Sequence, residues 1–194
     1  MEIIVTDRRI KRSNRALLDA SFQVLLHNPH ASLSEIANQA GVGRATLYRH
    51  FPTRENLLAA IAIESLEIVE QATAKRLRCE LRETSAIEQL VSALLPLADR
   101  FHFLQMMWTD IELDAEVCAL YEQQMAALER WITAGQRNGV LSEQLQPQWI
   151  VAMLDSMLYS ASWLISTHAL SPKEAEQQLL IGLLNGISGH KPTG

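Results

Sequence analysis

Cysteine, glycine, proline and aromatic residues are all scarce in this sequence. The 194 residues include two Cys, eight Gly and six Pro, and only 6% are aromatic. Cys79 and Cys118 are too few and too far apart for a disulfide framework or a metal-ligand cluster. We interpret them as buried or incidental thiols in a reducing cytoplasm, with a redox-sensing pair as the alternative. We expect neither a metal nor a cofactor.

The sequence also lacks a hydrophobic run long enough to cross a membrane. Its most apolar run, residues 150–165, is interrupted by Asp155 and falls short of the ~20 residues that a span needs. The first nine residues include charged side chains and contain no apolar signal core. Because 48% of the residues are hydrophobic, the composition predicts a soluble, cytoplasmic globular protein.

Catalytic motifs are absent as well. There is no His-Glu-x-x-His, no Gly-x-Ser-x-Gly and no Walker loop. The alternating acidic residues of 110–116 lack the glycine and the spacing of a calcium loop, and they are typical of the acidic start of a helix. We therefore expect that the protein is not an enzyme.

What the sequence does contain is a pair of short helices joined by a glycine turn, at residues 32–51. Ser32 and Glu35 form a capping box, which satisfies free amides at a helix start. Gly41 permits the left-handed backbone that ends this first helix. A second helix follows and ends before Pro52. This order predicts a helix-turn-helix, whose second helix fits the major groove of DNA.

These residues resemble the DNA-binding domain of the tetracycline-repressor (TetR/AcrR) family of bacterial transcriptional regulators. The resemblance covers roughly the first third of the chain. It is most specific at residues 46–51, Thr-Leu-Tyr-Arg-His-Phe. The chain departs from the family at Gly43, where the family usually has a serine or another side chain that caps the recognition helix.

The resemblance implies which residues contact DNA. Arg44 and Tyr48 would face the groove, and Arg44 is the best candidate base reader because arginine can bind guanine O6 and N7 together. Thr46 and His50 would reach phosphates, with a local helix hydrogen bond and a partly buried helix end as their respective alternatives. The predicted DNA contacts are Arg9, Arg12, Ser34, Arg44, Thr46, Tyr48, Arg49, His50 and Arg54.

Charge is distributed unevenly along the chain. Residues 1–56 carry eight basic and five acidic side chains, a net charge of +3, so the remainder carries −8 of the total of −5. A basic face would attract phosphate, while an acidic body would orient the protein on DNA. Arg9 and Arg12 belong to a basic arm that could follow the DNA backbone or enter the minor groove.

Two further candidates lie at helix starts. Ser34 lies early in its helix, beside free amides that bind phosphate. Arg54 opposes a helix dipole and therefore needs a partner such as phosphate.

Helical periodicity and capping signals continue to the end of the chain, and no strand is predicted. The expected helices cover residues 11–27, 32–40, 44–51, 53–82, 85–96, 103–109, 114–137, 147–168 and 171–187. Further capping boxes are expected at Ser85–Glu88 and Ser171–Glu174. The pattern predicts an all-α protein with a DNA-binding domain at residues 1–53 and a helical ligand-binding and dimerisation domain at residues 54–194.

The helical body is rich in large, soft side chains, which either form plain core or line an adaptable pocket. The resemblance implies an effector site here, with Met107, Trp108, Tyr121 and Trp163 as the candidate ligand contacts. It also implies dimerisation through the last two helices, and the candidate interface residues are Met157, Leu179, Gly182, Leu183 and Gly186. The alternative for the two glycines is that they only weaken a fraying helix.

The sequence as a whole predicts a homodimeric regulator, a repressor, that binds a palindromic double-stranded DNA operator and is released by a small hydrophobic or amphipathic effector. The alternatives are a regulator without a small-molecule inducer, and a helical carrier or enzyme with a vestigial helix-turn-helix. Nothing in the sequence identifies the effector, the operator or the target genes.

Overall fold

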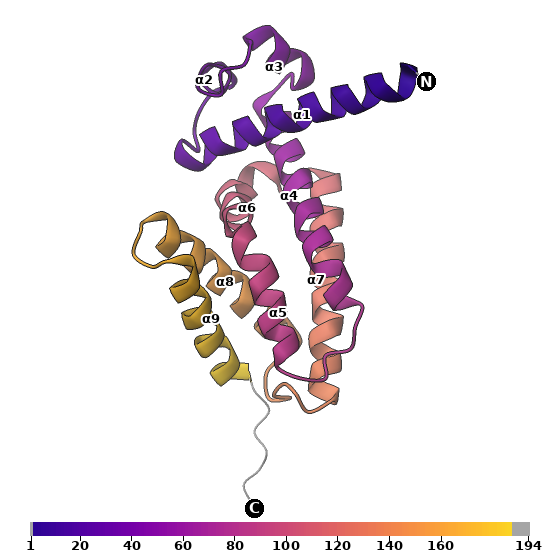
Figure 1. The fold of residues 1–194 in the computed structure, drawn as a ribbon, viewed down its shortest axis with the longest axis vertical. Helices are drawn as coiled ribbons and strands as arrows, with labels where there is room; N and C mark the ends of the chain where they lie inside the picture. The colour runs from indigo at the N-terminus through magenta and orange to yellow at the C-terminus, as the bar shows by residue number, and fades with distance from the viewer. Residues whose placement is uncertain (1, 188–194) are drawn as a thin grey trace, which may run out of the picture. The chain divides into compact units, whose positions relative to one another are not determined.

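The protein is described here by a computed structural model, which covers the backbone of residues 2–187 and the side chains of residues 15–187. The described residues form nine α-helices, a single 3-10 turn and no extended strand, so the all-α prediction is confirmed (Figure 1). The helices are α1 (Glu2–His27), α2 (Leu33–Gln39), α3 (Arg44–His50), α4 (Arg54–Leu77), α5 (Ser85–Leu94), α6 (Ala98–Ile111), α7 (Ala115–Arg137), α8 (Pro147–Ser166) and α9 (Pro172–Ile187), with the 3-10 turn η1 at Leu95–Leu97.

Three helix starts follow the capping chemistry that the sequence carries. Ser32 and Glu35 form the expected capping box at the start of α2, and Ser171 with Glu174 forms another at the start of α9. Thr53 Oγ1 accepts a hydrogen bond from the amide of Asn56 in the first turn of α4. These side chains satisfy amides that have no partner inside the helix.

Three expected helix boundaries and one expected capping box were wrong. Helix α1 begins at Glu2 rather than residue 11, and α4 ends at Leu77 rather than residue 82. Ser85 is already the first helical residue of α5, so the capping box with Glu88 does not form; Thr84 takes the cap position without a side-chain hydrogen bond. Helix α6 starts at Ala98, because Pro96 ends α5 and the chain continues through η1.

The chain divides into two compact units. Unit 1 comprises the described residues up to 65 together with 103–117, and unit 2 comprises residues 66–102 together with those from 118 onward. Helices α4, α6 and α7 each contribute residues to both units. The predicted functional boundary after residue 53 stays a prediction.

Unit 1 holds α1, α2 and α3 around a small apolar core. Phe22 of α1 packs edge to face on Phe103, with ring centroids 5.5 Å apart. Ile36 of α2 and Leu47 of α3 are fully buried. The short α2 and α3 therefore keep their mutual orientation through packing, since helices of seven residues are marginal on their own.

Unit 2 is a larger helical bundle formed around α5, α7, α8 and α9. Its buried residues include Leu90, Trp131, Leu158 and Leu183, each from a different helix. Helix α8 is long and apolar enough to cross a membrane. One such helix is weak evidence for a membrane span, because core helices of soluble proteins pass the same test of length and composition. Here Ile150, Leu154 and Leu158 of α8 are buried in the core, which accounts for the apolar character of that face.

Candidate DNA interface and ligand cavity

Helix α3 is held against α2 by one buried residue and by a tight glycine turn. Gly41 has a φ of +68°, the left-handed conformation expected of a helix C-terminus. Leu47 is the single buried residue of α3. The rest of this helix is therefore free to present side chains outward.

The side chains predicted to read DNA lie on that outward face. Arg44, Thr46, Tyr48 and Arg49 are all exposed, and His50 is half-buried beside Phe51, with ring centroids 6.3 Å apart. Gly43 occupies the N-cap position of α3 in extended conformation and makes no side-chain cap. The start of α3 thus keeps free amides in addition to the guanidinium of Arg44, both of which suit an anionic partner.

Ser34 and Tyr48 meet across the two helices. The Ser34 hydroxyl lies 3.1 Å from the Tyr48 hydroxyl, although the residues are 14 positions apart in sequence. Tyr48 remains 44% exposed. The pair joins α2 to α3 at their surface, and each hydroxyl keeps a further position for hydrogen bonding to phosphate.

Arg54 lies differently from what was expected. Its guanidinium donates to the carbonyl oxygens of Pro29 and Ala31 and to the Asp110 carboxylate, and the Arg54 side chain is 23% exposed. These partners offset the unfavourable placement of a cation at a helix N-terminus. In this arrangement Arg54 ties the α1–α2 loop to the start of α4 and the end of α6. The backbone of Arg9 and Arg12 lies in α1, while their side chains lie outside the described residues.

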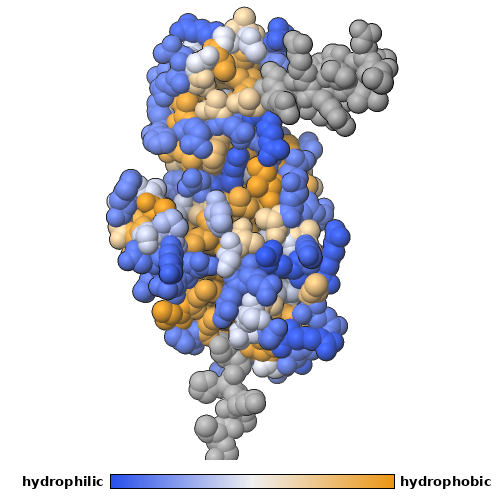
Figure 2. Space-filling view, in the orientation of Figure 1, coloured by the Kyte–Doolittle hydropathy of each residue, from blue (hydrophilic) through white to orange (hydrophobic). Residues whose placement is uncertain are grey.

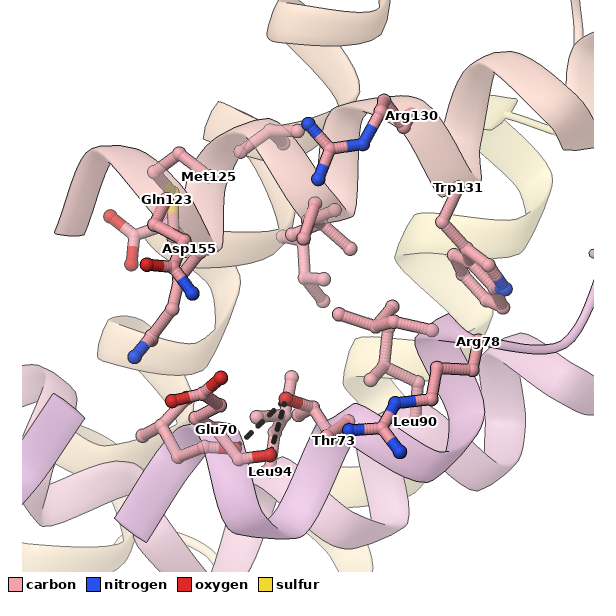
Figure 3. A pocket seen from close by; sticks show the side chains of 18 of the residues that line it. Glu70, Thr73, Arg78, Leu90, Leu94, Gln123, Met125, Arg130, Trp131 and Asp155 are labelled. Atoms are coloured by element: carbon pink, nitrogen blue, oxygen red, sulfur yellow. Dashed lines mark hydrogen bonds between the residues drawn. The ribbon is translucent and has the colours of Figure 1, made fainter. Parts of the chain in front are cut away.

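Unit 2 contains a cavity of about 400 Å³, a volume typical of small-molecule sites (Figure 3). It is lined by apolar residues of α4, α5, α7 and α8, among them Val69, Leu90, Leu94, Leu128 and Leu158. The buried indole of Trp131 forms part of the wall, and its Nε1 donates to the Cys79 carbonyl 2.9 Å away. The cavity thus has a mostly apolar wall with a few polar groups.

Two half-buried carboxylates, Glu70 and Asp155, lie in this wall, and Figure 3 shows both on the side away from Trp131. Nearby, burial and the negative charge of Asp155 raise the pKa of Tyr121 above its usual value. The lining also contains Gln124, whose Nε2 donates to the Leu66 carbonyl at 2.8 Å. The Oε1 atom of Gln124 is buried and has no hydrogen-bond partner.

None of the four predicted ligand contacts lines this cavity. Met107 and Trp108 belong to unit 1, and Met107 is buried there. Tyr121 and Trp163 belong to unit 2 but lie outside the lining, and Trp163 is 53% exposed. One lining residue that was missed did carry a signal in the sequence, because Asp155 interrupts the apolar run of residues 150–165.

The predicted interface residues need a correction. Leu179 and Leu183 are buried in the core of their own chain, so they do not present a surface to a partner. Gly182 and Gly186 are exposed, and a Cβ at Gly182 would lie 2.7 Å from Cε of Met157, so this glycine admits α8 of the same chain. Large apolar side chains that remain exposed on these two helices are Trp149, Trp163 and Ile181, and Figure 2 shows apolar surface over the α9 side of unit 2.

Fold and geometry together define an all-α protein with an N-terminal helix-turn-helix and a separate helical unit that encloses a cavity. Residues 17–61 match the family model described as bacterial regulatory proteins, tetR family. This match covers the helix-turn-helix segment, and the fold of the whole chain is that of solved TetR-like transcriptional regulators.

Three comparisons with two known proteins, LfrR and NfxB, illustrate the similarity. The transcriptional repressor LfrR of Mycolicibacterium smegmatis is 50% identical over 52 residues, which is 27% of this chain and 28% of LfrR. The transcriptional regulator NfxB of Pseudomonas aeruginosa is 24% identical over 147 residues, 74% of this chain and 77% of NfxB. The crystal structure of LfrR in complex with proflavine, from Mycobacterium smegmatis, superposes with a TM-score of 0.75 at 24% identity, covering 92% of this chain and 97% of that one.

A fourth comparison has the same fold with a different ligand. It is a regulator from Saccharomonospora viridis in complex with choline, with a TM-score of 0.68 at 18% identity over 93% of this chain and all of that one. The strong sequence match is thus confined to the DNA-binding domain, and the likeness over the rest of the chain is one of fold.

Proposed function

We propose that the protein is a cytoplasmic transcriptional repressor that binds a palindromic operator as a homodimer through α3 and leaves it when a small molecule occupies the cavity of unit 2. The observation that carries this proposal is the exposed face of α3, where Arg44, Tyr48 and Arg49 surround a single buried anchor, Leu47. A major groove admits one such helix. The match of this segment to LfrR, a repressor, supports the direction of regulation.

The effector part of the proposal rests on the cavity and on the neighbours. LfrR and the Saccharomonospora viridis regulator have been crystallised with proflavine and with choline. The cavity lies in unit 2, and α4 contributes both to its wall and to unit 1. An effector that binds better to a conformation unsuited to the operator would shift the population toward that conformation. By linkage, saturating operator must weaken effector binding by the same factor.

Binding-site selection from random duplex DNA tests the DNA-binding part. We expect an inverted repeat to be enriched, with half-sites about one helical turn or a multiple of it apart. Arg44→Ala should lower operator affinity by about tenfold or more, as expected for the loss of a bidentate base contact. Arg137→Ala removes an exposed arginine at the end of α7 and serves as the matched control. If the folded protein enriches no motif, a carrier or an enzyme with a vestigial helix-turn-helix becomes the better interpretation.

The salt dependence of operator binding gives an independent check. If about six phosphates are neutralised per dimer, the logarithm of the association constant should fall with the logarithm of salt concentration at a slope of roughly −5 or steeper. A slope near zero would contradict a basic binding face. If no small molecule releases the protein from its operator, a regulator without a small-molecule inducer becomes the better interpretation. Such a regulator would be controlled by a protein partner or by its abundance.

The dimer is expected to use the exposed face of α8 and α9. Exposed Ile181 and exposed Gly186 give α9 an apolar surface that a helix of a partner chain can approach closely. Ile181→Glu should convert the dimer to a monomer in sedimentation equilibrium and weaken operator binding. Leu113→Glu is the control, since Leu113 is 93% exposed in unit 1.

A further inference from the structure

The polar groups of the cavity in unit 2 are unevenly divided between donors and acceptors. Trp131 Nε1 already donates to the Cys79 carbonyl, and the Thr73 hydroxyl donates to the Val69 carbonyl at 2.9 Å. Gln124 Nε2 is likewise used by the Leu66 carbonyl. Each of these three buried or half-buried side chains therefore already uses one N–H or O–H donor within the protein.

Acceptors remain in the same wall. The Oε1 atom of Gln124 is buried and lacks a hydrogen-bond partner, although a buried acceptor of this kind is normally satisfied. The half-buried carboxylates of Glu70 and Asp155 add two negative charges to this wall. A ligand that supplied N–H donors would complete the hydrogen bonding of this wall.

The charges in the lining also favour a ligand that carries N–H groups and a positive charge. Glu70 and Asp155 are half-buried, whereas the basic residues of the lining, Arg78 and Arg130, are exposed. A charge beside an apolar wall interacts more strongly than one surrounded by water. The enclosed part of the cavity is therefore negative, and Figure 3 shows Trp131 facing Glu70 and Asp155 across it. An aromatic ring can pack on the part of the indole that lines the cavity, and a cation is favoured by its π face.

From this geometry we infer that the effector is an organic cation with a flat apolar body and at least one N–H group, held with its positive end toward Glu70 and Asp155 and an N–H donated to Gln124 Oε1. This inference rests on the proposed function, of which it specifies the ligand class. It names a charge and a donor pattern, both of which can be varied independently in small probes.

Four bicyclic probes of similar size separate the two requirements. At pH 7.5, 4-aminoquinoline is a cation with N–H donors, 1-methylquinolinium is a cation without them, quinoline is neutral and naphthalene-1-carboxylate is an anion. Titration calorimetry on the DNA-free dimer should give affinities in that order. We expect about tenfold tighter binding for 4-aminoquinoline than for quinoline, with 1-methylquinolinium between them.

Substitutions then assign the effect to residues. Glu70→Gln and Asp155→Asn should each weaken 4-aminoquinoline binding about five- to tenfold and change quinoline binding by less than twofold, because only the charge is removed. Glu122→Gln is the matched control, since Glu122 is an exposed glutamate of α7 that does not line the cavity. It should leave every affinity within twofold. Thermal melting of each variant confirms that it is folded.

Several outcomes would overturn the inference. Equal affinity for quinoline and 4-aminoquinoline would remove the requirement for charge, and tightest binding of naphthalene-1-carboxylate would shift the site to Arg78 and Arg130. Unchanged cation binding in the folded Glu70→Gln, Asp155→Asn double variant would show that the cation lies elsewhere. These results are independent of binding-site selection. If an operator is enriched but cations are not preferred, the proposed regulatory function stands and the inferred ligand class is wrong. If cations bind but no operator is enriched, the ligand site stands and the proposed regulatory function is wrong.

Discussion

The guanidinium of Arg54 lies 3.2 Å from the carboxylate of Asp110 and so joins the first turn of α4 to the last turn of α6 within unit 1. The same guanidinium donates to the carbonyl oxygens of Pro29 and Ala31, just before α2. One side chain therefore connects three segments of the DNA-binding unit. Its structural role is established by these contacts, whereas the phosphate contact suggested by the sequence stays a prediction.

The first prediction concerns this residue. Arg54→Ala should lower the free energy of unfolding by about 2–3 kcal/mol, because two carbonyl groups and a carboxylate lose their partner. Arg54→Lys should recover only part of the loss, since an ammonium group cannot reproduce the planar fork of donors. Chemical denaturation measures both changes. The control is Arg15→Ala, whose ion pair with Glu64 is 3.7 Å long with the Arg15 side chain 66% exposed, so the change should stay within about 0.5 kcal/mol.

A different result would restore the original interpretation of Arg54. If Arg54→Ala leaves stability unchanged but weakens binding to operator and to random DNA alike, the residue acts on phosphate rather than on the fold.

The second prediction concerns the two glycines of the turn between α2 and α3. Gly43→Ser should stabilise the protein by about 0.5 kcal/mol, because Gly43 has an ordinary negative φ of −64° and serine adds the missing N-cap hydrogen bond of α3. A Cβ at this position would meet only Thr46 Oγ1, at 3.5 Å. Gly41→Ser should instead cost about 1 kcal/mol, because its φ of +68° is unfavourable for any residue with a Cβ. Thermal unfolding of the pair measures this difference, and equal effects would contradict it.

The third prediction compares two helical glycines of unit 2. A Cβ at Gly135 of α7 would overlap Leu81, with Cγ only 2.8 Å away, and Leu81 is fully buried. Gly135→Ala should therefore lower the free energy of unfolding by about 2 kcal/mol through overpacking. Gly182→Ala meets only the flexible end of Met157, so the gain in helix propensity should offset the contact and leave stability within about 0.5 kcal/mol. Chemical denaturation of the two variants measures this difference. If their midpoints coincide, α7 can move away from Leu81.

Local chemistry is what the sequence predicts well. The capping boxes at Ser32 and Ser171, the left-handed Gly41 and the helix break at Pro96 each depend on neighbouring residues, and all four are found in the structure. The Ser85 capping box fails because the same residue types occur one position inside the helix. A pattern of side chains indicates a helix end only to within a residue or so.

Long-range relationships are what the sequence could not provide. Glu70 of α4 and Asp155 of α8 line the same cavity although they are 85 positions apart in the sequence. No periodicity in the sequence predicts that these two residues lie close together. Leu179 and Leu183 form an apolar stripe that suits an interface and a core equally well, and the structure buries it inside its own chain. Apolar patterning identifies a face that must be covered, but not which element covers it.

The fourth prediction concerns acid stability. Hydrogen bonds from the Ser32 hydroxyl and backbone amide lower the pKa of Glu35 below its ordinary value of 4.5, and those of Ser171 lower the pKa of Glu174 in the same way. Because the folded-state pKa values are depressed, the contribution of each carboxylate is present above the ordinary pKa and is lost as the pH falls through the folded value. Stability should therefore decline below about pH 4.5, as α2 and α9 lose their caps.

Glu35→Gln and Glu174→Gln test this assignment. Each substitution removes the titrating group, so the loss of stability between pH 5 and pH 3 should be smaller than in the parent protein, although the variants start from a lower value at pH 7. Carboxyl carbon NMR titration should show both pKa values depressed, and Ser32→Ala should raise only that of Glu35. The exposed Glu122 on α7 provides the control variant, Glu122→Gln, which removes no cap. If Ser32→Ala leaves the titration of Glu35 unchanged, the capping box does not set its pKa, and the acid response must arise from other carboxylates.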